Sequence, residues 1–498
     1  MRPQQPFLDL WRLVLEAKSP LSIANGRADL VDDVLLAATP AGLPYIPATA
    51  LAGVLRHAWH EQEGAAAAED LFGAKASKDA DLQAGQASRF ECSHAHIHDA
   101  RNRVVSDLLA EVSLDDPILG PLVNQLPVKR QRVRINAQGA AADTGHFDRS
   151  VVPSGHRFSV ELRIWSESTE VAQQAKKQLQ ALLYSPALRV GGLTRSGLGQ
   201  LSVQQCAHRH IDLRNPKDLA FYLDRPTQLD DIKGLQVQKP PASSEPNTPW
   251  ATLKLNLQAE GALRVGQGYT AYTEHGKTKL PHALPYTEVA VQWPAEKGLA
   301  QLQPRIVIPG TSIKGAVAHR LAFHDRRLRG AWASAEAVKN ALKDHPQATP
   351  GLAQWLGRIK ISDTDTDAAS QAGGLIFEDI VIAPPSTKQV GHRTHNSIDR
   401  FTGGVRDGLL FTEEYLFRVS LPTRLHLTLA ACRRTDAHAW DALRLTLSDL
   451  VSGRLAIGAD SAGGLGYLQG SYPENEFEAL RTAAVAQRAR FTKEDNAV

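Results

Sequence analysis

Apolar and polar positions in the first half of this chain alternate with two periods, one typical of strands and the other of helices. Segments with a period of two and segments with a period near 3.6 follow one another in order. Leu51, Leu55 and Trp59, for example, fall on one face of a helix. The pattern predicts a strand at 9–17, a helix at 49–62, strands at 88–98 and 157–165, a helix at 171–184 and a strand at 200–204. This β-α-β-β-α-β order is that of the ferredoxin-like split βαβ unit.

The second half of the chain repeats this order of elements. It predicts strands at 251–264, 374–382, 415–431 and 467–470 and helices at 311–325 and 436–451. Ile46-Pro47-Ala48-Thr49 corresponds to Ile308-Pro309-Gly310-Thr311, and the glycine-rich loop at 191–199 corresponds to the loop at 458–466. Motifs that recur once, in the same order and about 265 positions apart, indicate a duplicated domain rather than a short-period repeat.

We therefore predict an α+β protein with two tandem ferredoxin-like (RRM-like) units. The first unit spans residues 1–238 and the second unit spans residues 250–498. Residues 239–249 read K-P-P-A-S-S-E-P-N-T-P, which is the composition of a linker. Each unit also carries a long insertion before its third strand, at residues 100–154 and 384–414. Insertions of this length usually carry function.

Composition narrows the class of protein. The 498 residues have a net charge of only +3, so any nucleic-acid site must be a local cationic patch. The three cysteines are scattered and form no C-x-x-C pair, which argues against a disulfide scaffold or a zinc ribbon and favours a reducing cytoplasm. There is no signal peptide and no apolar run of about 18 residues, so we expect a cytoplasmic protein without a membrane span.

The stretch I-P-G-T-S-I-K-G at residues 308–315 predicts a strand end, a sharp turn and a helix start. Proline ends the strand, glycine permits an unusual φ, and Thr311 and Ser312 can cap the helix. The free backbone N–H groups of such a helix start favour an anion such as a phosphate. Thr311, Ser312 and Lys314, with Thr49 in the first unit, are therefore candidate nucleic-acid contacts.

Cations and glycines supply the other candidate contacts. Rows of Lys and Arg can neutralise phosphates, and glycine lets a loop approach them closely. A solvated surface is the alternative interpretation of the cations, and tight packing is that of the glycines. The cations are Lys129, Arg130, Arg132 and Arg134 in the first insertion and His392, Arg393, Arg400 and Arg406 in the second. The loop residues are Gly191, Gly192 and Arg195 in the first unit and Gly463 and Gly464 in the second.

Two further segments match metal sites only in part. His94, His96 and His98 would share one face of a strand and could bind zinc, but same-face neighbours on a straight strand are about 7 Å apart. We expect a polar sheet face there. The aspartates at 363, 365 and 367 match the start of an EF-hand loop, but the glycine and the glutamate that such a loop needs are missing. A hydrated loop is expected instead.

Taken together, these motifs resemble the RAMP superfamily of CRISPR systems, and more narrowly the Cas-seven-type backbone subunits of type III effector complexes. The resemblance rests on I-P-G-T-S-I-K-G, on H-N-S-I-D-R-F-T-G-G-V-R-D-G-L-L-F-T-E-E at residues 395–414, and on the two glycine-rich loops. Two units in one chain resemble the double-backbone fusions of a type III-D variant. The resemblance implies a ferredoxin-like core, inserted thumb hairpins, and CRISPR guide RNA, target RNA and other effector subunits as partners.

In many type III members an aspartate after the first strand cuts target RNA with a divalent metal. Asp32 and Asp33 lie in the corresponding loop, and we predict that Asp32, or else Asp33, is catalytic. Hard oxygen ligands suit Mg²⁺ (or Mn²⁺), which the single carboxylate of Asp32 would hold weakly. The nearest analogue in the second unit is Glu288, which leaves the activity of that unit open.

Two other functions stay open on the sequence. The first is a purely structural guide-binding subunit whose nuclease lies in a neighbouring protein. The second is a guide-processing endoribonuclease that uses His57, His60 or His319 as general acid or base. Substitution of the two aspartates separates a nuclease from a scaffold, and metal-independent cutting of a repeat hairpin would favour the processing enzyme.

Overall fold

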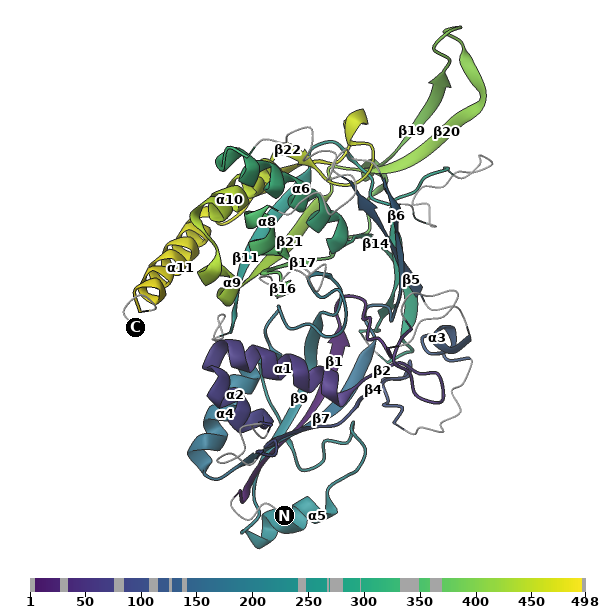
Figure 1. Ribbon diagram of the computed structural model, residues 1–498. Coiled ribbons are helices and arrows are strands. Elements are labelled where there is room, and N and C mark those ends of the chain that lie inside the picture. Colours follow the sequence, from purple (N-terminus) through teal and green to yellow (C-terminus); the bar gives the residue numbers. More distant parts are fainter. Residues whose placement is uncertain are drawn as a thin grey trace.

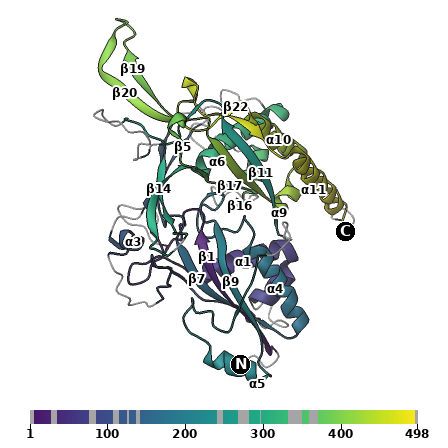
Figure 2. The same cartoon turned by 180° about the vertical axis from the view of Figure 1, so that it is seen from behind.

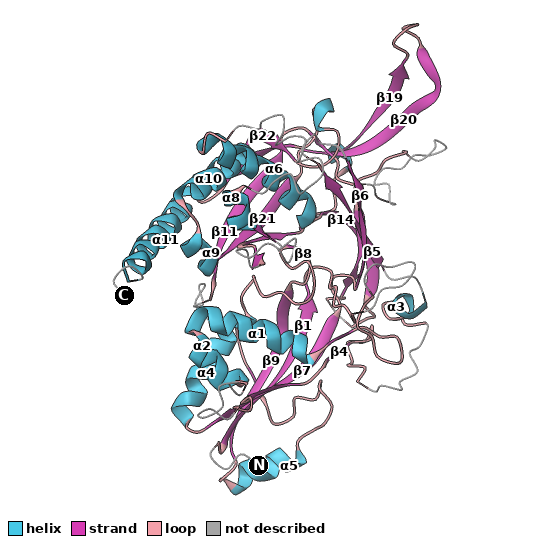
Figure 3. Ribbon diagram, viewed as in Figure 1, coloured by secondary structure: helices cyan, strands magenta, loops and turns pink. Residues whose placement is uncertain are grey.

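The computed structural model describes most of the chain. The described residues are 5–26, 35–75, 85–106, 115–124, 128–136, 141–240, 248–266, 268, 281–295, 297–331, 349–358 and 370–494. Helices and strands occur in both units, so the predicted mixture of α and β structure is confirmed (Figure 3). None of the helices that the structure describes is both long and apolar enough to cross a membrane.

The sheet of the first unit is built around β1 (Phe7–Ala17). This strand pairs antiparallel with β7 (Arg157–Ser166) on one side and with β9 (Leu201–Asp212) on the other. β3 (Phe90–Cys92) and β4 (Ala95–Ile97) pair with the far side of β7. The predicted strands therefore lie across the sheet in the order fourth, first, third, second. One face of the sheet is covered by α1 (Ala48–Glu63), α2 (Ala65–Phe72) and α4 (Thr169–Leu183) (Figure 1).

β1 is buried on both faces, although its sequence alternates like a half-buried strand. All of its residues are buried. At the start of β1 the second face is covered by α5 (Pro216–Asp224), whose Phe221 packs against the cluster that contains Leu8 and Leu10. The segment after α5 covers Arg12, which donates to the carbonyls of Gln228 and Asp231. Arg12 is tolerated inside because its guanidinium donates to the carboxylate of Glu161 over 2.8 Å.

The sheet of the second unit has the same strand order. β11 (Trp250–Ala259) lies between β21 (Ser420–Thr428) and β23 (Tyr467–Ser471), and β17 (Leu375–Glu378) pairs with the far side of β21. One face is covered by α6 (Gly310–Leu328), α8 (Pro350–Leu356) and α10 (Ala437–Val451) (Figure 1), of which α6 and α10 are seen from behind in Figure 2. Apolar side chains of the three helices share one core with the sheet.

One predicted strand was wrong. Residues 415–431 form the end of β20 (Val405–Phe417), all of β21 and the start of α9 (Leu429–Arg434). Arg418 has a φ of 50°, in the left-handed region, which ends the first strand. Thr428 then caps α9, because its side chain accepts a hydrogen bond from the backbone N–H of Ala431. Similar breaks divide the predicted strands at 88–98, 251–264 and 374–382.

Each long insertion contains a hairpin, and the two hairpins lie differently. The first is β5 (Val128–Ile135) with β6 (Ala141–Val151), and the second is β19 (Val390–Ile398) with β20. The first hairpin packs against the second unit, whereas the second hairpin projects from the molecule (Figure 1). Because of this difference in packing, cations of the first hairpin that face the second unit are buried or half-buried, whereas those near the tip of the second hairpin are exposed.

The two units share structure beyond the first hairpin. β8 (Ser196–Gly197) of the first unit pairs in parallel with β17 of the second. Val291 and Ala300 of the second unit belong to the apolar core of the first. They flank the connection between β13 (Thr287–Gln292) and β14 (Gln301–Ile308), which form a small sheet with β18 (Ile380–Ile382). The boundaries at 238 and 250 remain a prediction, and residues 241–247 of the linker lie outside the described residues.

Several short elements and the C-terminal helix α11 complete the part of the chain that the structure describes. They are β2 (Tyr45–Ile46), α3 (Gly120–Asn124), β10 (Gln236–Val237), β12 (Ala262–Leu263), β15 (Gly357–Arg358), β16 (Gln371–Ala372), η1 (Thr387–Gln389), β22 (Ser452–Ala456), η2 (Ser461–Gly463) and α11 (Glu474–Glu494).

Candidate nucleic-acid interface

Four cationic side chains from distant segments converge between the two units. They are Arg132 of β5, Arg149 of β6, Arg195 of the glycine-rich loop and Lys314 of α6, and we call them the cation cluster. Burial lowers the pKa of Lys314, and the charges of Arg195 and Arg132 lower it further. Burial and then Arg149 lower the pKa of Arg132 in the same way. Partly buried cations that repel one another form a site that an anion would stabilise.

Local contacts hold these side chains in place. The guanidinium of Arg132 lies over the ring of Phe147, its partner across the hairpin, with 5.6 Å to the ring centroid. Its Nε is buried without a hydrogen-bond partner among the described residues. Arg195 Nε donates to the carbonyl of Gly373 in the second unit over 2.5 Å. Three predicted residues, Arg132, Arg195 and Lys314, are thus brought together, and Arg149 joins them.

The glycine-rich loop of the first unit lies directly against this cluster. Gly191 has a φ of 91°, and a Cβ there would come within 2.5 Å of the Ser22 carbonyl oxygen. A Cβ on Gly192 would come within 2.5 Å of a guanidinium nitrogen of Arg149. Glycine is needed for close packing at Gly191, where the φ is positive and the close atom belongs to the backbone, whereas the close atom at Gly192 is the end of a flexible side chain. Gly191 is thus tightly packed, which sets the loop beside the cations, and contact of this loop with RNA remains a prediction.

Arg130 must be removed from the predicted nucleic-acid contacts. Its side chain is 1% exposed and donates to both carboxylate oxygens of Glu288, over 2.8 and 2.7 Å. It also donates to Asp379 over 3.2 and 2.8 Å. Burial alone would lower the pKa of Arg130, but Asp379 and Glu288 raise it well above its ordinary value. Arg130, Arg132 and Arg134 do lie at alternate positions of one strand, β5, as predicted. The second unit covers Arg130, whereas Arg134 is exposed.

The helix starts of the two Ile-Pro turns are occupied by side chains of their own units. In the second unit, Asp379 accepts a hydrogen bond from the backbone N–H of Gly310 over 2.7 Å. In the first unit, His94 Nδ1 accepts one from the N–H of Ala48 over 3.0 Å. The expected capping by Thr311 and Ser312 side chains does not occur. Thr49 is exposed in the first turn of α1, and Thr311 and Ser312 are half-buried in the first turn of α6. Their contact with a nucleic acid remains a prediction.

The second hairpin presents cations together with apolar side chains. Arg400 is exposed in the turn between its strands, where Phe401 is 99% exposed, and Arg406 is exposed near the start of β20. Nearer its base, Arg393 donates to the carbonyl of Gly463 over 3.4 Å, and His392 lies 3.4 Å from a carboxylate oxygen of Glu414. Gly464 has a φ of 86° and open space around it, so its positive φ alone explains the glycine there. Lys129 of the first hairpin is half-buried.

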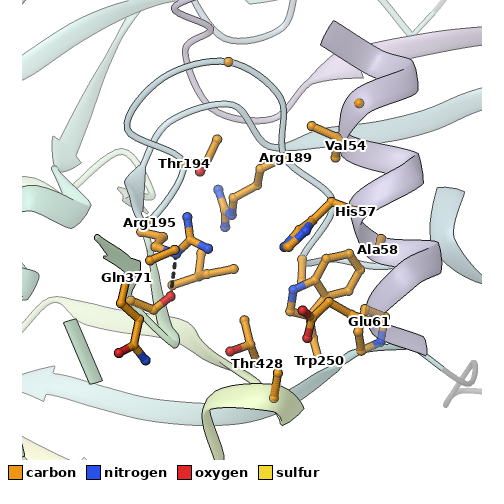
Figure 4. Close-up of a pocket in the computed structure, with 18 of the residues that line it drawn as sticks. Val54, His57, Ala58, Glu61, Arg189, Thr194, Arg195, Trp250, Gln371 and Thr428 are labelled. Carbon is orange, nitrogen blue, oxygen red and sulfur yellow. Dashed lines mark hydrogen bonds between the residues drawn. The ribbon is translucent and has the colours of Figure 1, made fainter. Parts of the chain in front are cut away.

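A pocket of about 620 Å³ lies between the two units, next to the cation cluster. Arg195 and Gly191 form part of its wall, and Arg195 lies beside Gln371 of the second unit, where it donates to the carbonyl of Gly373 (Figure 4). α1 contributes His57 and Glu61, and the second unit contributes Trp250. The pocket was not predicted, because no local pattern marks it. Arg149 was also missed, although its position opposite Arg130 in the hairpin could have been inferred from the repeat.

The predicted catalytic and metal residues have different outcomes. Asp32 and Asp33 lie outside the described residues, as do the aspartates at 363, 365 and 367. Glu288, their analogue in the second unit, is engaged by Arg130 and accepts a hydrogen bond from the hydroxyl of Tyr286 over 2.7 Å. His98 is buried, with contacts to Ser159 and Asn102, so its ring does not share a site with His94 and His96.

One protein family matches this chain over more than half of its length. The family model described as the RAMP superfamily matches residues 14–202 and 301–469, one region in each unit. The two regions contain all four residues of the cation cluster and both glycine-rich loops. No curated protein has a sequence significantly similar to this chain.

Proposed function

The chain belongs to the RAMP superfamily, and on this premise we propose that it is a tandem backbone subunit of a type III CRISPR effector complex. It binds guide RNA along the sugar-phosphate backbone and assembles with other effector subunits. The finer assignment to the Cas-seven type follows from the motifs that both units contain. The strand order fourth, first, third, second in both sheets supports a ferredoxin-like core in each unit, and the two hairpins are proposed as its thumbs.

The cation cluster is the observation that carries this proposal. Arg132, Arg195 and Lys314 come from three segments, and the charges of the two arginines lower the pKa of Lys314 in addition to its burial. A bound anion would offset this repulsion. Guanidinium and ammonium groups beside a glycine loop suit phosphate contacts. A protein that holds guides must accept any sequence, and contacts of this kind carry no sequence information.

We further propose that the first unit cuts target RNA with Asp32, or else Asp33. The carboxylate would hold Mg²⁺ (or Mn²⁺) against the scissile phosphate or help to remove the attacking 2′ proton. The ion pair of Glu288 with Arg130 supports a single active centre, because it leaves the second unit's analogue engaged with a cation. This part of the proposal rests on the family resemblance, and a purely structural guide-binding role is its alternative.

RNA binding is tested with the full chain and single-stranded RNAs of several sequences over a range of salt concentrations. Replacing Arg132, Arg195 and Lys314 together by alanine should weaken binding about equally for all sequences. The magnitude of the salt slope should fall by up to about 0.7 for each lost phosphate contact. The control replaces Lys177, Lys217 and Lys254, three exposed lysines outside the cluster, so that the change in net charge is the same. Equal affinity and slope in the two triple variants would reject the interface.

Cleavage is tested with guide-loaded complex and labelled complementary RNA, with and without Mg²⁺. Asp32→Ala should remove a cut while guide and target binding persist. If the Asp32→Ala, Asp33→Ala double variant cuts at every wild-type position at the wild-type rate, the nuclease lies in another subunit. Metal-independent cutting of a repeat hairpin that is lost in His57, His60 or His319 variants would instead identify a guide-processing enzyme.

A further inference from the structure

Three potential metal ligands meet at the base of the second hairpin. His395 of β19, Glu413 of β20 and Asp460 of the glycine-rich loop have donor atoms that all lie within 4.8 Å of one another. His395 Nε2 and Glu413 Oε1 are 3.0 Å apart. Two ligands at 90° with metal–ligand bonds of about 2.1 Å would be separated by about 3.0 Å, so this pair already has the spacing of adjacent ligands.

Neighbouring residues orient the three side chains. Glu413 is 1% exposed, and its Oε2 accepts a hydrogen bond from Arg264 Nε over 2.9 Å, which turns Oε1 towards His395. The imidazole of His395 stacks on the ring of Phe411, with centroids 4.9 Å apart. Asp460 is exposed, and no described residue donates a hydrogen bond to its carboxylate. Contacts that orient ligands in this way are typical of built metal sites.

The internal repeat supplies an independent observation. Arg132 pairs with Phe147 across the first hairpin as His395 pairs with Phe411 across the second. Two residues further along the second strand of each hairpin, Arg149 corresponds to Glu413.

The third ligand also has a counterpart in the repeat. Leu193 corresponds to Asp460, and both residues have a left-handed backbone, with φ of 55° and 56°. Both loops keep the same unusual backbone geometry at this position. Two arginines and a leucine in the first unit are thus replaced by histidine, glutamate and aspartate in the second. All three exchanges at one place are towards residues that bind cations.

We propose that His395, Glu413 and Asp460 bind a divalent transition-metal ion, Mn²⁺ or Zn²⁺. One imidazole nitrogen and two carboxylate oxygens form a donor set that suits these ions. The ion restores, in the second unit, the positive charge that Arg132 and Arg149 supply in the first. Its use as a phosphate contact rests on the proposed function, whereas metal binding itself does not.

The alternative is a metal-free ion pair in which a protonated His395 lies between the two carboxylates. The test is calorimetric titration of the chelator-treated full chain with Mn²⁺ and Zn²⁺ in the absence of RNA, with the absorption spectrum of added Co²⁺ as a second readout. The wild type should bind one ion at this site. Asp460→Leu, which introduces the residue of the first unit, and His395→Ala should each weaken binding by more than about 10- to 100-fold, the loss that removal of an outer-shell partner causes.

Asp407→Asn, at an exposed acid on the same hairpin, is the matched control and should leave metal affinity unchanged. Thermal unfolding of each variant without metal checks that it is folded. Absence of binding in the wild type, or undiminished binding in folded His395→Ala and Asp460→Leu, overturns the proposal. Because no RNA is present, failure of this site is distinguishable from failure of guide binding.

Discussion

Arg130 and Glu288, 158 positions apart, form a bidentate ion pair that joins the two units of this chain. The Nε–Oε1 and Nη2–Oε2 distances are 2.8 and 2.7 Å, and both side chains are buried. Asp379 completes the arrangement, since it accepts hydrogen bonds from the same guanidinium and from the first N–H of α6. The first hairpin is therefore anchored to β13 and to the junction of β17 and β18 in the second unit, beside the start of α6.

Removal of this guanidinium should be strongly destabilising. Arg130→Ala leaves Glu288 and Asp379 buried without their cation, which typically costs about 3–5 kcal/mol. Urea unfolding of the full chain measures the loss. Arg134→Ala, at an exposed position of the same strand, should change the free energy of unfolding by less than about 0.5 kcal/mol. Equal stability of the two variants would show that the ion pair does not hold the units together.

Lys314 should lower the stability of the free protein and strengthen its binding to RNA. Burial, Arg195 and Arg132 lower its pKa, so its charged form is disfavoured in the free protein. Lys314→Met should therefore raise the melting temperature without RNA, and it should weaken RNA binding and reduce the salt slope by up to about 0.7. Lys177→Met, at an exposed lysine of α4, is the control. A lower melting temperature for Lys314→Met would contradict this account.

The two glycines Gly191 and Gly53 should respond in opposite ways to substitution by alanine. Gly191 has a φ of 91°, and its Cβ would meet the Ser22 carbonyl oxygen at 2.5 Å, so Gly191→Ala should cost about 1–3 kcal/mol. Gly53 is an exposed residue of α1 with open space around it, and Gly53→Ala should stabilise by about 0.5–1 kcal/mol. Chemical denaturation measures the free energy of unfolding of both variants. A Gly191→Ala variant as stable as the wild type would show that the loop can move to accept the Cβ atom, and would contradict this prediction.

His156 should make the protein sensitive to mild acid. Burial lowers the pKa of its imidazole from 6.5 to about 3. Between these values the unfolded chain binds a proton here that the folded chain does not, so stability falls as the pH decreases below 6.5. The loss from this residue at pH 5 is about 2 kcal/mol.

Unfolding free energies at pH 7 and pH 5 test this expectation. His156→Phe should lose less stability than the wild type over that interval. His60→Phe, at an exposed histidine of α1, should retain the wild-type dependence. The same pH dependence in all three proteins would assign the acid sensitivity to other groups.

The sequence by itself determined the duplication, the family and the positions of the main helices. Motifs that recur in order are a property of the chain, and helical periodicity depends on residues only three or four positions apart. For these reasons the helices at 49–62, 311–325 and 436–451 lie close to α1, α6 and α10. The same local reasoning placed Arg130, Arg132 and Arg134 on one strand, and could not say what would cover that strand.

Only the tertiary structure decided the role of each of these arginines. Glu288 and Asp379 reach Arg130 from the second unit. Arg132 instead lies near Arg149 and Lys314, and Arg134 stays exposed. The proposed ligands His395, Glu413 and Asp460 are likewise brought together by the second hairpin and the glycine-rich loop, which are separated in the sequence. Burial and charge pairing depend on such long-range contacts, and a periodic pattern of neighbouring residues contains no information about them.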